Sequence, residues 1–126
     1  MEGKKNKLEN KGHVVKNEII EHVNRLNEEA YSLRNTDSKT SFQKASKALD
    51  LSTKCDYQIG HAWSLLHLGF YYSNIGDNRE ALDLLIKGHA LFEELNLPPG
   101  INTALYNLTV YYICLLYTSD AADDLF

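Results

Sequence analysis

The residues of this chain that could do chemistry are five histidines, two cysteines and an acidic cluster near the C-terminus. The histidines are His13, His22, His61, His67 and His89. None of them stands in an H-E-x-x-H pattern. His61 and His67 are six residues apart, so they face different sides of a helix and cannot form an i,i+4 ligand pair. We therefore expect both to have partly exposed ring nitrogens rather than to be metal ligands.

The cysteines and the acidic cluster do not form a recognisable site either. Cys55 and Cys114 are too few for a disulfide framework or a CxxC metal site, so we expect both to be reduced. Asp120, Asp123 and Asp124 lack the ordered oxygen-ligand spacing of a calcium loop. The chain also has no glycine-rich phosphate loop and no G-x-S-x-G elbow. The sequence therefore predicts neither an enzyme nor a bound metal or cofactor.

Composition and charge narrow the class of protein. A chain of 126 residues with 44% hydrophobic content is long enough for one domain with a core. Its formal charge of -4 and pI near 5.7 argue against nucleic acid or an anionic membrane as partner. No signal peptide is evident, and no run reaches the roughly 18 apolar residues of a membrane span. We expect a cytoplasmic protein.

Two helical segments meet at Gly76-Asp77. Residues 62–74 are apolar on nearly every side, whereas residues 79–95 show apolar side chains at helical spacing. Gly76 can take the left-handed conformation that ends a helix. Asp77 can cap the next helix, with Glu80 three residues later as in a capping box. The sequence therefore predicts a helical hairpin.

The hairpin resembles a tetratricopeptide repeat, whose signature is W-x2-L-G-x2-Y, then A-x3-F, then P. The matching residues are Leu65-x2-Leu68-Gly69-x2-Tyr72 and Ala81-x3-Leu85, followed by Gly88 where a small alanine is usual. The closing proline is missing. Gly69 on the first helix, with Ala81 and Gly88 on the second, would let the two backbones approach closely. We expect Gly69 to lie against that face of the second helix.

The same spacing recurs at an offset of 40 residues. Gly60-x4-Leu65-x2-Leu68-x2-Tyr71-Tyr72 returns as Gly100-x4-Leu105-x2-Leu108-x2-Tyr111-Tyr112. Upstream, Ser41, Ala45 and Ala48 precede Ala81, Leu85 and Gly88 by 40 positions. The period is therefore longer than the ~34 residues of the standard repeat.

The repeats predict an all-α fold of antiparallel helix hairpins. The expected helices span residues 13–34, 40–55, 58–74, 78–95 and 99 to at least 113. By the resemblance, about two and a half repeats would stack into a right-handed superhelix. Residues 1–11 are polar and expected to be disordered, and residues 12–113 would form the repeat domain.

The C-terminal residues do not continue the repeat. From position 114 the chain reads CLLYTSDAADD, which resembles the conceptual translation of a sequencing-library adaptor. We therefore expect residues 114–126 to be a non-native tail. Without a following helix, the last repeat helix would present an uncovered apolar edge, through which the chain would self-associate. That edge comprises Leu105, Leu108, Val110, Tyr111, Tyr112 and Ile113.

The tetratricopeptide resemblance also implies a binding surface. In that family the first helix of each hairpin lines a concave surface that meets an extended peptide or a partner helix. The implied partner-binding residues are Asn24, Asn27, Tyr31, Arg34, Trp63, Leu66, Phe70, Asn74, Tyr106 and Val110. Trp63, Leu66 and Phe70 fall at i, i+3 and i+7, one stripe of one helix. This stripe either faces solvent as an interaction site or is covered by another element.

Two classes of function remain open. The first is a protein-protein interaction scaffold that binds a peptide or protein partner on its concave face. The second is an N-terminal sensory or regulatory region of a bacterial signalling enzyme. The 40-residue period resembles repeats that precede diguanylate cyclase or histidine kinase domains. In both classes the residues present would act by binding.

Overall fold

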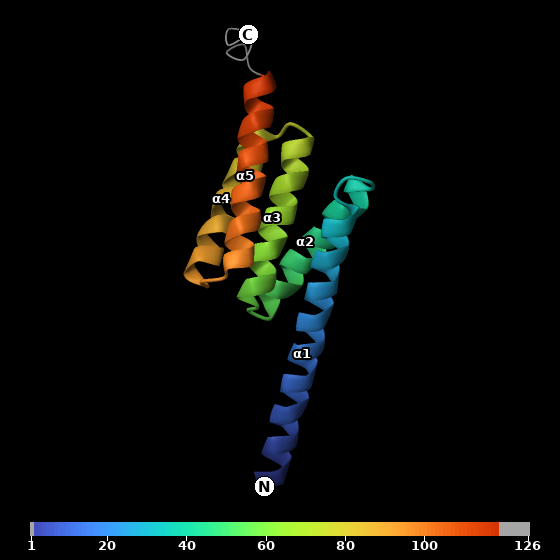
Figure 1. Ribbon diagram of the computed structural model, residues 1–126. Helices are drawn as coiled ribbons and strands as arrows, with labels where there is room; N and C mark the ends of the chain where they lie inside the picture. Colours follow the sequence, from blue (N-terminus) through green and yellow to red (C-terminus); the bar gives the residue numbers. More distant parts are fainter. Residues whose placement is uncertain (1, 119–126) are drawn as a thin grey trace.

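Five α-helices follow one another in the computed structural model, which describes residues 2–118 and the side chains of residues 11–117. They are α1 (Glu2–Leu33), α2 (Ser38–Lys54), α3 (Gln58–Asn74), α4 (Asn78–Glu94) and α5 (Pro98–Thr118). Each helix packs antiparallel against the next, and α3 also contacts α1 and α5 (Figure 1). The all-α prediction is confirmed.

The expected helix bounds agree closely with the structure except at the two ends. Helix α1 begins at Glu2 rather than near residue 13, so the prediction that residues 1–11 are disordered is wrong for residues 2–11. Lysine and glutamate are good helix formers, and scattered asparagines with one glycine do not outweigh them. This part of α1 projects beyond the other helices (Figure 1).

Helix α5 runs past Ile113 to Thr118, so the first residues of the expected tail continue the helix. Residues 119–126, including the acidic cluster Asp120, Asp123 and Asp124, lie outside the described residues. The adaptor-like origin of the tail stays a prediction.

The turns after α2, α3 and α4 share one backbone conformation. Asp56, Gly76 and Asn96 take positive φ angles of 54°, 81° and 51°. In each turn the next N–H donates to a carbonyl five residues back, as Tyr57 does to Ser52 at 2.8 Å. This bond satisfies a carbonyl that the helix end leaves without a partner. The prediction for Gly76 is confirmed. The same conformation at Asp56 was not predicted, because glycine is the usual signal for it, although aspartate also tolerates it.

Replacing Gly76 with alanine is expected to lower the free energy of unfolding by about 1–2 kcal/mol, because a side chain is strained at positive φ. A Cβ there would meet nothing within 4 Å, so the loss reports the backbone conformation alone. Chemical denaturation measures it. The control is Gly12→Ala in exposed α1, where a Cβ also meets nothing within 4 Å and no loss is expected. Equal stabilities of Gly76→Ala and the parent would contradict the turn.

Two aspartates cap helices α2 and α4. The Asp77 carboxylate accepts from the Glu80 N–H at 3.3 Å, and that of Asp37 accepts from the Thr40 N–H at 3.2 Å. The hydrogen bond with Thr40 holds the pKa of Asp37 below its usual value. The predicted cap at Asp77 is confirmed, and α5 begins at Pro98.

The core centres on the close approach of α3 and α4. A Cβ added at Gly69 would lie 2.7 Å from Leu85 Cδ2 and 3.3 Å from the Leu85 backbone nitrogen. A Cβ added at Gly88 would lie 2.7 Å from Leu66 Cδ2. The predicted contact of Gly69 with α4 is therefore confirmed, and the small residues let the two helices pack without a gap.

The apolar edge expected on α5 is only partly exposed. Leu105, Tyr112 and Ile113 are exposed, whereas Leu108 and Val110 are half-buried. The prediction is wrong for Tyr111, which belongs to the core and donates its hydroxyl to the Asn78 carbonyl at 3.1 Å. This bond joins α5 to the start of α4, and burial raises the pKa of the phenol. Self-association through the remaining edge stays a prediction.

Candidate functional site

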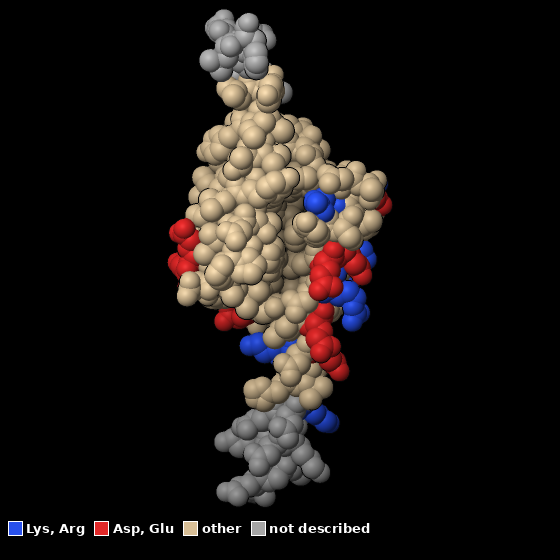
Figure 2. All heavy atoms as spheres, in the orientation of Figure 1, with Lys and Arg blue, Asp and Glu red and all other residues tan. Residues whose placement is uncertain are grey.

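A groove runs between α1 and α5, with α3 as its floor. It consists of two adjoining cavities of about 480 and 350 Å³, called here the first and the second cavity. Both are lined by Tyr31 of α1, His67 of α3 and Thr103 of α5. Helices α1 and α5 each contact α3 but not one another, which leaves the space above α3 open. Figure 2 shows the surface hollowed between the uncharged side over α5 and the charged side over α1.

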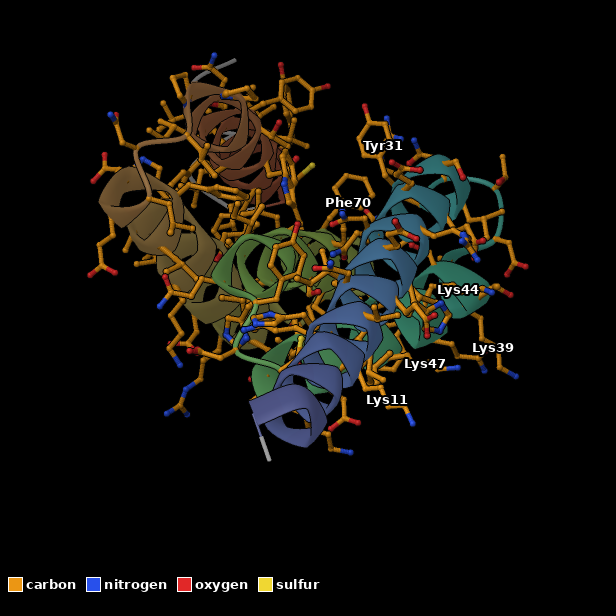
Figure 3. The ribbon with its side chains drawn as sticks, turned by 90° about the horizontal axis from the view of Figure 1, so that it is seen from below. Lys11, Tyr31, Lys39, Lys44, Lys47 and Phe70 are labelled. Atoms are coloured by element: carbon orange, nitrogen blue, oxygen red, sulfur yellow. The ribbon has the colours of Figure 1, made fainter. Side chains whose placement is uncertain are left out.

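Seven of the ten predicted partner-binding residues line this groove. They are Asn24, Asn27, Tyr31, Arg34, Trp63, Phe70 and Tyr106. Sequence reasoning missed Glu28, His67, Asn102, Thr103 and Asn107. Figure 3 shows the side chains of Tyr31 and Phe70 in the space between α1 and α5. The concave side of the helical layer therefore gathers residues from three helices.

Three predicted residues line neither cavity. Leu66 is fully buried against Gly88 of α4, so the prediction that it faces a partner is wrong. The stripe of Trp63, Leu66 and Phe70 is therefore divided, with α4 covering its middle member. Asn74 is exposed at the end of α3, and Val110 is half-buried in α5.

His67 takes the central place in the groove that Leu66 was expected to hold. The spacing i, i+4 and i+7 aligns Trp63, His67 and Phe70, and this alignment was the signal that could have found it. The imidazole is stacked on the Trp63 indole at a centroid distance of 6.1 Å and an angle of 17°. Its ring also lies 6.1 Å from the Tyr31 ring.

The environment of His67 keeps its imidazole neutral. The residue as a whole is only 8% exposed. Burial, with a smaller contribution from the Arg34 charge, lowers the pKa of His67 to about 4. Among residues 2–118, His67 has no hydrogen-bond partner. No side-chain nitrogen or oxygen atom in that range is both fully buried and without a partner, so the His67 ring nitrogens are not fully buried. Its unpartnered ring nitrogens are therefore accessible from the groove.

The structure also agrees with the prediction for His61. It is partly exposed, and its Nδ1 lies 3.2 Å from Thr53 Oγ1. Burial lowers its pKa as well.

The two predicted asparagines of α1 bind α3 and the turn before it. Asn27 is buried and donates from Nδ2 to the Gly60 carbonyl at 3.1 Å, while its Oδ1 lies 3.2 Å from the Ser64 hydroxyl. Asn24 Oδ1 accepts from the Tyr57 hydroxyl at 2.8 Å. Asn27 therefore holds α1 in place at the edge of the first cavity.

Compared with known protein families, curated proteins and solved structures, the chain matches none. The tetratricopeptide assignment therefore stays a prediction that rests on the residues.

The charges of the groove are separated along α1 and the turn that follows it. Glu28 lines the first cavity and Arg34 the second. The Arg34 guanidinium carbon lies 3.8 Å from the centroid of the Tyr31 ring, and its Nη1 donates to the Tyr31 carbonyl at 2.7 Å. Glu28 makes no ion pair within the part of the chain that the structure describes. Helices α3 and α5 contain no Asp, Glu, Lys or Arg.

In residues 2–118, no three His, Cys, Asp or Glu side chains lie together in a way that could hold a metal ion. No helix in the same range is long and apolar enough to cross a membrane.

Proposed function

We propose that this domain binds an extended peptide segment of a partner protein in the groove between α1, α3 and α5. The observation that carries the proposal is the continuity of the two cavities, which share Tyr31, His67 and Thr103. A continuous hollow suits a chain that lies across several helices, whereas a small ligand is usually enclosed in one pocket.

The side chains along the groove have the chemistry of peptide recognition. Tyr31 and Tyr106 are 49% and 66% exposed on opposite walls, and aromatic side chains are enriched among residues that dominate binding energy. Asn102 and Asn107 supply amides to the second cavity that can pair with a peptide backbone. Exposed aromatic rings beside amide groups that can form hydrogen bonds are typical of a surface that binds another protein.

The tetratricopeptide resemblance supports the same surface. In that family the first helices of successive hairpins line the concave side, and here residues of α1, α3 and α5 line the groove. The turn hydrogen bonds recur every 20 residues, from Tyr57 to Ser52, from Asp77 to Tyr72 and from Leu97 to Phe92, which is compatible with a 40-residue unit of two helices. We interpret the chain as a tetratricopeptide-like scaffold on these grounds.

The proposal predicts that short random peptides displayed on phage will be enriched on the immobilised domain. Replacing both Tyr31 and Tyr106 with alanine should weaken binding of the enriched peptides by at least about tenfold, because both rings would contact the peptide. Fluorescence anisotropy with labelled peptides measures the dissociation constants.

The matched control is Ile86→Ala combined with Tyr112→Ala, which removes two comparably exposed apolar side chains that line neither cavity. This control should bind as the parent does. Failure to enrich any peptide, or unchanged binding by the Tyr31 and Tyr106 variant, would contradict the proposal. Trp63→Ala is a poorer test of this point because the indole also packs on Phe92 in the core, with ring centroids 4.8 Å apart.

A further inference from the structure

We infer that the first cavity binds a positively charged side chain, arginine or lysine, of the peptide that occupies the groove. The inference rests on the proposed function and adds the chemistry of one position in the bound segment. It follows from three features of the cavity: an unpaired carboxylate, aromatic rings and an uncharged acceptor on the floor.

The carboxylate belongs to Glu28 on α1. It lines the first cavity and has no ion pair among residues 2–118. The neighbouring glutamate differs, because Glu29 forms a salt bridge with Lys44 of α2 at 3.0 Å. No lysine or arginine lines the first cavity, so the charge of Glu28 is not neutralised there. A cationic ligand group would supply the missing partner.

Two aromatic rings line the same cavity. Trp63 lies on the floor, where it is half-buried, and Tyr31 lies on the same helix as Glu28 with the Arg34 guanidinium already over its ring. The negative face of an aromatic ring attracts a cation, most strongly for tryptophan, and the effect grows where water is excluded. The long aliphatic part of lysine or arginine can also pack against these rings.

The floor of the cavity accepts a cation because His67 is uncharged. Burial keeps its imidazole neutral at pH 7, so it does not repel a positive group, and a neutral imidazole has one nitrogen that accepts a hydrogen bond. Within residues 2–118 that nitrogen has no protein partner. An N–H of an ammonium or guanidinium group would satisfy it.

The second cavity has the opposite preference, which fixes where the cation goes. Arg34 lines the second cavity but not the first, whereas Glu28 lines only the first. Helices α3 and α5 contain no Asp, Glu, Lys or Arg, so they add no charge to either cavity. A basic side chain is therefore attracted to the Glu28 end and repelled from the Arg34 end.

The test uses the phage-selected peptides, which should carry arginine or lysine at one shared position. The tightest binder is compared with the same peptide containing norleucine there, against the parent and Glu28→Gln. Trp63 is the only tryptophan of the chain, so its fluorescence reports occupation of the first cavity. We expect norleucine to weaken binding to the parent about tenfold and to make no difference to binding by Glu28→Gln.

The matched control is Glu29→Gln, which removes the same charge one residue away and should retain the full preference for the basic peptide. If selected peptides lack a shared basic residue, or if Glu28→Gln weakens the basic and norleucine peptides equally, the inference is wrong and the groove proposal stands. If no peptide binds the parent at all, both are wrong.

Discussion

Replacing Gly69 with leucine is expected to lower the free energy of unfolding by about 1–3 kcal/mol, because overpacking forces well-packed elements apart. A Cβ at this position would already lie 2.7 Å from Leu85 Cδ2. The Leu85 side chain could rotate away, but its backbone nitrogen at 3.3 Å could move only with α4 itself. The larger side chain of leucine must therefore separate α3 from α4.

Chemical denaturation followed by circular dichroism measures this loss. The matched control is Gly12→Leu, since Gly12 lies on the projecting part of α1 and a Cβ there meets nothing within 4 Å. That control should be as stable as the parent, because leucine is a better helix former than glycine. An unfolding midpoint of Gly69→Leu equal to that of the parent would contradict the close packing of α3 and α4.

Lowering the pH from 6.5 to 4 is expected to remove about 3 kcal/mol of stability through His67 alone. Its pKa is about 4 in the folded chain, against 6.5 for an ordinary histidine. Between these values the unfolded chain binds a proton that the folded chain does not, so the free energy of unfolding falls as the pH falls. The contribution of neutral His67 to the free energy of unfolding is fully present above pH 6.5. It is lost as the pH falls to 4 and does not decrease further below that pH.

The variant His67→Phe separates this effect from other titrations. Phenylalanine keeps an aromatic ring beside Trp63 but binds no proton, so this variant should lose less stability over the same pH range than the parent. His61 contributes a change of the same sign, because burial lowers its pKa too, and it is present in both proteins. Identical pH profiles of His67→Phe and the parent would show that His67 is not buried as described.

The helices and their pairing were largely predictable because the signals are local. The expected span of residues 58–74 coincides with α3, whose C-terminal end is marked by the nearby turn at Gly76. The contact of Gly69 with α4 was predictable for the same reason, because a short turn brings neighbouring helices together. The start of α1 was not, since polar residues with good helix propensity resemble a disordered end in composition.

The groove was only partly predictable. Spacing along α3 places Trp63, Leu66, His67 and Phe70 on one side of the helix, but it does not say which edge of that side a neighbour covers. The path of α4 decides this, because Gly88 lets Leu66 pack inward and leaves His67 beside the groove. The neutral state of His67 has the same origin, since its pKa depends on burial and on Arg34 in the turn after α1. The sequence by itself therefore determined the helices and their order. Only the tertiary structure decided which side chains face the groove and with what charge, because burial depends on contacts between residues far apart in the chain.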